Sequence, residues 1–99
     1  MSAGDRVVVV VSGVVQGVGF RWFVHRAASG LGVTGWVRNR RDGSVELVAE
    51  GSPASIAALV ATVGEGPDGA WVRDVAVRHE PPTGSFAAFE IRPGSHPGD

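Results

Sequence analysis

The 99-residue sequence predicts an α+β fold with the element order β-α-β-β-α-β and a short strand appended at the C-terminal side. Three observations lead to this prediction. The valine run Val7–Val11 is typical of a buried strand, two later segments repeat apolar residues at helical spacing, and Asp42-Gly43 separates two strand-like segments. The order is that of the split β-α-β arrangement, so we expect a mostly antiparallel sheet with two helices on one face.

The first two elements are a strand and a helix. Val7–Val11 lacks polar alternation, so we expect it to be covered on both faces and central in the sheet. Residues 20–31 place apolar side chains at i, i+3, i+4, i+7, i+8 and i+11, which makes one stripe along a helix. Gly32 is the expected end of that helix.

A hairpin follows, with strands over residues 33–39 and 45–50 joined through the Asp42-Gly43 turn. Glu46 and Glu50 alternate with apolar residues in its second strand, which predicts a solvated stripe.

The second half of the chain predicts a helix and two strands. Ser52 followed by Pro53 is a clear helix start, and the glycines of 64–69 end the helix. Residues 72–79 and 86–91 are the last two strands. We expect one domain over 1–99, with frayed tails at 1–5 and 93–99.

The turn between the first strand and the first helix is rich in glycine and leads directly to Arg21. Such a turn leaves backbone N–H groups unpaired at the positive end of the helix dipole, which is a ready site for an anion. A guanidinium in the first helical turn adds two donors for a phosphoryl group. Taken alone the signal is moderate, because the chain has no P-loop lysine and glycines also serve simply to permit a tight turn.

Composition limits the other possibilities. The net charge is −1, and no apolar run is long enough to span a membrane, so we expect no nucleic-acid or membrane partner and a cytoplasmic location. The absence of cysteine excludes thiolate chemistry and disulfides, and three scattered histidines give no metal-ligand spacing.

Two motifs extend the argument. The pattern V-x-G-x-V-Q-G-V-x-F-R-x-F stands at Val11–Phe23, and G-W-V-x-N-x-x-D-G-x-V-E stands at Gly35–Glu46. In this order they resemble the acylphosphatase family, and the similarity continues through Glu50-Gly51 and Phe89–Ile91.

The resemblance implies a ferredoxin-like α/β sandwich that hydrolyses acyl phosphates to a carboxylate and inorganic phosphate. It implies catalytic roles for Arg21 and Asn39. It also implies a phosphate-binding loop at 16–20, which consists of Gln16, Gly17, Val18, Gly19 and Phe20. A carboxylate leaves without needing a proton, so we expect no metal and no cofactor. The expected partner is a small acyl phosphate, and we expect a monomer.

Topology supports this set of residues. In the split β-α-β arrangement the first two strands are parallel, so their C-terminal ends meet at one edge of the sheet. We therefore expect Asn39 beside the glycine loop. Without the motif, an asparagine before a hairpin turn would simply cap the turn.

Other candidate residues are assigned structural roles. Arg38, Arg40 and Arg41 flank Asn39 on what we expect to be a solvated hairpin face. His25 is expected to be a surface or partly packed histidine. The three tryptophans are expected to pack at the edges of the core, at positions Trp22, Trp36 and Trp71.

The sequence leaves three other functions open. One is the acylphosphatase-like module of hydrogenase-maturation carbamoyltransferases, which would act on carbamoyl phosphate. Another is an RNA-recognition module, which shares the topology but displays aromatic and basic residues on its middle strands. The third is a catalytically idle domain that senses phosphate through the same loop.

Overall fold

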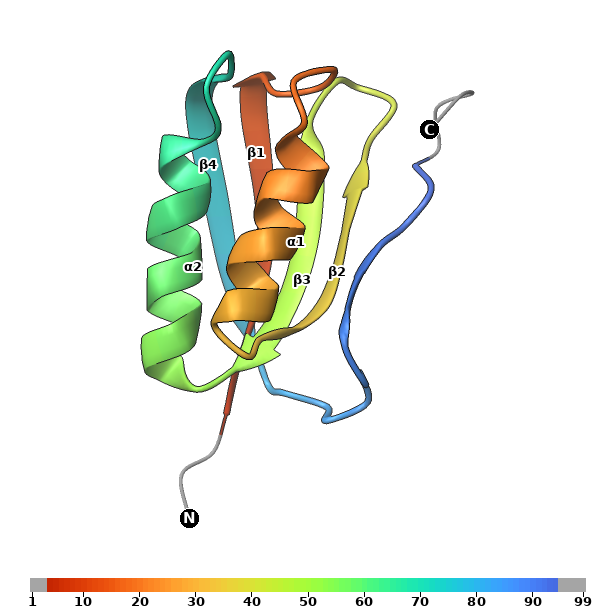
Figure 1. Cartoon of the computed structure of the whole chain (residues 1–99). Coiled ribbons are helices and arrows are strands. Elements are labelled where there is room, and N and C mark those ends of the chain that lie inside the picture. The colour runs from red at the N-terminus through yellow and green to blue at the C-terminus, as the bar shows by residue number, and fades with distance from the viewer. Residues whose placement is uncertain (1–3, 95–99) are drawn as a thin grey trace.

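The computed structural model describes residues 4–94. Five strands form one sheet in the order β4-β1-β3-β2-β5, and both helices lie on the same face of it (Figure 1). Every neighbouring pair of strands is antiparallel except β2 and β5, which are parallel. The elements are β1 (Asp5–Val14), α1 (Phe20–Gly30), β2 (Thr34–Asn39), β3 (Val45–Gly51), α2 (Pro53–Glu65), β4 (Trp71–Glu80) and β5 (Phe89–Ile91). The expected split β-α-β fold with an added strand is confirmed.

Local signals set the helix boundaries as expected. The Ser52 hydroxyl accepts a hydrogen bond from the Ser55 amide at 3.2 Å, and Pro53 occupies the first position of α2. After α1, Gly32 takes a left-handed conformation with φ 69°, which ends that helix. Asp5 was expected in a frayed tail but is the first residue of β1, paired with Gly51 of β3. The rest of that prediction falls largely on residues 1–3 and 95–99, outside the described range.

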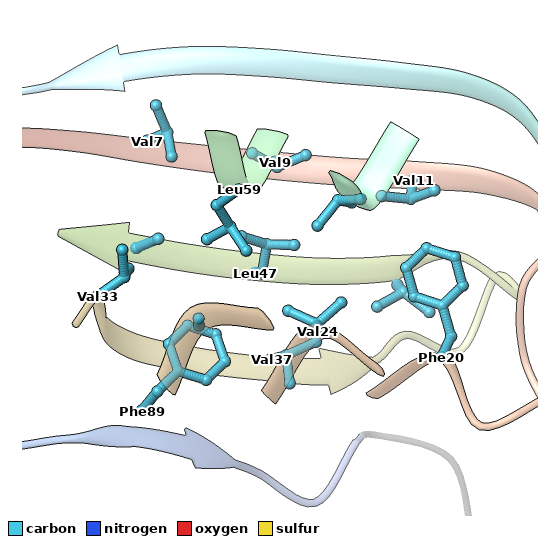
Figure 2. Packing of buried hydrophobic residues seen from close by; sticks show 14 of the residues in the cluster. Val7, Val9, Val11, Phe20, Val24, Val33, Val37, Leu47, Leu59 and Phe89 are labelled. Atoms are coloured by element: carbon cyan, nitrogen blue, oxygen red, sulfur yellow. The ribbon is translucent and has the colours of Figure 1, made fainter. Parts of the chain in front are cut away.

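The hydrophobic core lies between the helices and one face of the sheet (Figure 2). Val7, Val9 and Val11 of β1 point into it and are fully buried. The valine run is central, as expected, but it is not covered by helices on both faces. Val8 and Val10 lie on the opposite face, where Val8 pairs with Arg78 and Val10 pairs with Glu46. That face is therefore covered by polar side chains rather than by a second layer.

Glu50 is the main correction to the expected solvated stripe, because only 6% of it is exposed. Its carboxylate accepts hydrogen bonds from the Arg6 guanidinium at 2.6 Å and from the backbone amides of Thr83 and Gly84 at 3.0 and 2.8 Å. The Thr83 hydroxyl donates a fourth at 2.8 Å. The connection from β4 to β5 is thus held against the end of β3, and Figure 1 shows it passing across the lower end of the sheet.

This fastening also explains why the last strand is shorter than expected. Pairing begins where the Gly35 amide donates to the Ala88 carbonyl at 3.0 Å, and β5 covers only Phe89–Ile91 instead of 86–91. Phe86 lies in the connection, where its ring is 5.5 Å from the guanidinium carbon of Arg6. A cation–π contact in the connection takes the place of strand pairing.

The tryptophans also differ from expectation. Trp22 and Trp71 are 60% and 58% exposed, so neither packs at the edge of the core. Trp36 is partly buried on the helix-free face, where its ring lies 5.2 Å from the guanidinium carbon of Arg38 and 5.0 Å from that of Arg92. The Trp36 ring therefore packs against two guanidinium groups instead of against the core.

The Glu50 contacts predict a specific dependence of stability on pH. Burial alone would raise the pKa of this carboxyl, but the hydrogen bonds from Thr83, Arg6 and Gly84 outweigh it and lower the pKa to about 2. A depressed pKa in the folded state stabilises the fold above the ordinary value of 4.5, and this contribution is lost as the pH falls toward 2. We expect Glu50→Gln to lower the free energy of unfolding at pH 7 by about 2–3 kcal/mol in urea titrations.

The difference between wild type and Glu50→Gln should shrink steadily as the pH is lowered from 5 to about 2. Glu90→Gln is the matched control, because Glu90 is exposed and its ion pair with the Arg92 guanidinium is long, at 4.0 Å. Its effect on the free energy of unfolding should therefore be within about 0.5 kcal/mol. A Glu50→Gln protein as stable as this control would contradict the assigned role.

Candidate functional site

The loop between β1 and α1 is held at both ends by buried residues. Val15 is 1% exposed and Phe20, the first residue of α1, is 2% exposed. Between them Gly17 and Gly19 both have φ 76°, a left-handed conformation. This conformation costs a residue with a Cβ atom about 1–2 kcal/mol, whereas glycine adopts it readily. These two glycines fold the loop tightly and present its backbone rather than side chains.

The start of α1 has the partial positive charge of the helix dipole and no acidic side chain in its first turn to offset it. The N-cap residue is Gly19, so no side chain caps the helix. Among residues 4–94, the backbone N–H groups from Gly17 to Trp22 have no protein acceptor, and the first helical hydrogen bond runs from the Phe23 amide to the Gly19 carbonyl at 3.0 Å. A Cβ built on Gly17 or Gly19 would meet nothing within 4 Å, so the space beside these two glycines is open. Unpaired donors at a helix N-terminus beside open space suit an anion.

Arg21 lies in the first turn of this helix and is partly buried. Within the described range its guanidinium makes no ion pair or hydrogen bond, whereas Arg6, Arg38 and Arg78 are each paired with glutamate. The guanidinium beside the uncapped helix start is therefore available to a ligand.

Asn39 is the last residue of β2 and is 5% exposed. It shares the helix-facing side of the strand with Val37 and Gly35, as the alternating burial of β2 shows. β1 and β2 are both antiparallel to β3 and hence parallel to each other, so the glycine loop and Asn39 lie at the same end of the sheet (Figure 1). This is the arrangement expected from the topology.

Gln16 has a role that the sequence did not indicate. Its side-chain amide donates hydrogen bonds to the backbone carbonyl of Arg40 at 2.7 Å and to that of Ser44 at 2.9 Å. The start of the loop is thus joined to the β2–β3 turn directly after Asn39. No local pattern predicts this pairing, because the partners are 24 and 28 positions away.

The β2–β3 turn itself is structural, as expected for Asp-Gly. One carboxylate oxygen of Asp42 accepts from the Ser44 hydroxyl at 2.6 Å and from the Ser44 amide at 3.0 Å, and these bonds lower the pKa of Asp42. Arg38 forms a 2.8 Å ion pair with Glu46, which also fits the expected hairpin face.

His25 is partly packed, in line with its expected structural role. Its ring centroid lies 5.8 Å from that of Trp22 and 6.4 Å from that of Phe89. In the part of the chain that the structure describes, no three His, Asp or Glu side chains are grouped so that they could hold a metal ion.

Comparison with known proteins now decides the family. The acylphosphatase family model matches residues 7–91, which includes the loop, Arg21 and Asn39. The chain belongs to the acylphosphatase family. An acylphosphatase from Synechococcus sp. is 50% identical over 93 residues, covering 94% of this chain and 98% of that protein. The crystal structure of acylphosphatase from Bacillus subtilis superimposes with a TM-score of 0.86 and 36% identity, covering 89% of this chain and 98% of that one.

A similar fold also occurs inside a larger protein. Full-length HypF in a phosphate- and nucleotide-bound form matches with a TM-score of 0.84 and 26% identity, but the match covers 93% of this chain and only 12% of HypF. Family membership decides in favour of an enzyme that hydrolyses acyl phosphates over the RNA-recognition module that shares this topology. Neither described helix is long and apolar enough to cross a membrane.

The loop conformation predicts the effect of adding one methyl group to this acylphosphatase. Gly19→Ala should lower the free energy of unfolding by about 1 kcal/mol, because residue 19 would keep a left-handed φ. Relief of this strain would also shift the backbone amides of the loop, so we expect kcat/KM for benzoyl phosphate to fall by about 10-fold.

Gly32→Ala is a matched control at the other end of α1. Gly32 has φ 69° and open space around a built Cβ, so the loss of stability should be similar while kcat/KM stays unchanged. Equal kcat/KM in the two variants would contradict a role for the loop in catalysis.

Proposed function

We propose that this acylphosphatase holds the phosphoryl group of its substrate with Arg21 and the backbone amides of residues 16–20, and that Asn39 orients the attacking water. The observation that supports this most is the uncapped start of α1, which lies at the end of the sheet where β2 ends in Asn39. Its backbone donors and the Arg21 guanidinium have no protein partner among residues 4–94. The same arrangement supports a reaction without a metal ion.

The chemistry demands little of the side chains. Water attacks phosphorus, the bond from phosphorus to the carboxyl oxygen breaks, and the products are a carboxylate, inorganic phosphate and a proton released to solvent. The carboxylate is stable as it leaves, so no general acid is required. Catalysis then depends on stabilising charge on the phosphoryl oxygens and on placing the water in line.

Arg21 and the loop amides suit the first task. The guanidinium is permanently charged and planar, and it can donate two parallel hydrogen bonds to phosphoryl oxygens. The backbone donors are fixed by Gly17 and Gly19, so they need no reorganisation when charge develops.

Asn39 suits the second task. Its amide has both donors and an acceptor but does not titrate, so it positions a water and does not deprotonate it. Burial to 5% exposure restricts the side chain, as positioning requires. The contacts of the loop are with the phosphoryl group, so the proposal covers acyl phosphates as a class. A monomeric state and a cytoplasmic location remain predictions.

The first test is hydrolysis of benzoyl phosphate in EDTA, with p-nitrophenyl phosphate as the ester control. We expect cleavage of the acyl phosphate alone, because an aryl ester needs more help for its leaving group. Arg21→Ala should lower kcat/KM by about 10²–10³-fold, the usual cost of losing one stabiliser of developing charge.

Arg26→Ala is the control for Arg21→Ala, because Arg26 is an exposed arginine on the same helix. Its activity should equal that of wild type. Activity that disappears in EDTA, or an Arg21→Ala enzyme with normal kcat/KM, would overturn the corresponding part of the proposal.

Asn39→Ala separates water positioning from phosphate binding. We expect kcat to fall by about 10²-fold, since misplacement of the nucleophile alone can cost this much. The inhibition constant for inorganic phosphate should change little, because Arg21 and the loop amides remain. Circular dichroism confirms that the variant is folded at the assay temperature. A parallel loss of phosphate affinity would instead assign Asn39 to phosphate binding.

A further inference from the structure

The side chain of Gln16 joins two parts of the site that come from different regions of the chain. Its amide nitrogen donates one hydrogen to the Arg40 carbonyl at 2.7 Å and the other to the Ser44 carbonyl at 2.9 Å. The same carbonyls close the β2–β3 turn, because Arg40 N donates to the Ser44 carbonyl at 2.8 Å and Gly43 N donates to the Arg40 carbonyl at 3.2 Å. Gln16 therefore binds the base of the turn, where β2 has just ended at Asn39.

The two carbonyl acceptors determine which way the amide faces. Only the NH₂ group has two donors, and a carbonyl oxygen in its place would oppose two other oxygens. Both donors of Gln16 are used within the protein, so its side chain is not available to donate to a phosphoryl group. Its side chain contributes to the site by linking the loop to the β2–β3 turn.

This link matters because the loop and Asn39 have separate supports. Val15 and Phe20 anchor the loop in the core between β1 and α1, and pairing with β3 holds Asn39. A water held by Asn39 must be in line with a phosphoryl group held by the loop, and an error of about 1 Å in such an arrangement can cost 10²-fold in rate.

We propose that Gln16 is a positioning residue, which fixes the phosphate loop against the β2–β3 turn and so aligns Asn39 with the bound phosphoryl group. The inference rests on the roles proposed above for Arg21 and Asn39. It goes beyond them by assigning the side chain of Gln16 to the alignment of the two parts of the site and not to the substrate.

Gln16→Met tests the link with a side chain of similar length that donates no hydrogen bond. We expect kcat for benzoyl phosphate to fall by about 10- to 100-fold, while the inhibition constant for phosphate changes less than about 3-fold, since the loop backbone and Arg21 remain. Glu50→Gln is the control for lost stability, because it loosens the other end of the sheet and should leave kcat unchanged.

Gln16→Glu adds a readout that a general loss of packing would not produce. At neutral pH its carboxylate would oppose two carbonyl oxygens, which raises its pKa and breaks the link. Protonation restores one O–H donor, so the ratio of its kcat to that of wild type should rise as the pH falls from 8 to 5. Gln16→Met should show no such recovery.

A double-mutant cycle with Asn39→Ala tests whether Gln16 acts through Asn39. If it does, adding Gln16→Met to Asn39→Ala should lower kcat less than 3-fold further, because aligned residues act as a unit. Losses that multiply in full, a Gln16→Met enzyme with normal kcat, or a Gln16→Glu enzyme without recovery at low pH would each overturn the inference.

The same experiments separate this inference from the proposed function. Wild type that does not cleave benzoyl phosphate, or Arg21→Ala that cleaves it normally, would refute the proposed function. Active wild type and impaired Arg21→Ala together with normal Gln16 variants would refute only the positioning role.

Discussion

The antiparallel pairing of β3 with both β1 and β2 is the constraint on which the site depends. Because each of these strands runs opposite to β3, they run parallel to each other, and their C-terminal ends meet at one edge of the sheet. The glycine loop follows the C-terminal end of β1, and Asn39 is the last residue of β2. The hydrogen bonds from the Gln16 side chain to the Arg40 and Ser44 carbonyls link these two segments directly.

One-sided coverage of the sheet has a second consequence. The helices bury the face that carries Val7, Val9 and Leu47, and the opposite face is covered by paired arginines and glutamates. At the end of the sheet away from the site, Glu50 holds the β4–β5 connection with hydrogen bonds from backbone amides and from Arg6. A buried charge is tolerated there because its acceptor positions are satisfied. Connecting segments are thus held by side-chain hydrogen bonds at both ends of the sheet. The uncharged amide of Gln16 does this beside the site, and the carboxylate of Glu50 does it at the opposite end.

The mechanism proposed for the site uses fixed donors more than titrating groups. All Lys and Arg positions of the chain are arginine, and Arg6, Arg38 and Arg78 are each paired with glutamate. The guanidinium of Arg21, in the first turn of an uncapped helix, has no such partner within residues 4–94. Backbone amides, a guanidinium and a neutral amide are enough for a substrate whose leaving group is already stable. In the proposed mechanism, an activated substrate allows a small domain with these few groups to act as a hydrolase.

Signals within a few residues are enough to predict the elements, their order, the helix caps and the hairpin turn. They also place Arg21 at the start of the first helix and Asn39 at the end of the second strand. The sequence also indicated the family through two motifs that span the loop and the hairpin. Only the folded chain shows the burial of Glu50, the contact of Phe86 with Arg6, the exposure of Trp22 and Trp71, and the partners of Gln16. The partners of Glu50 in the β4–β5 connection lie 33 and 34 positions away and those of Gln16 lie 24 and 28 positions away. Residue type and periodicity report what a side chain prefers, but the segment that comes to lie against it is chosen by strand order and by the path of the connections.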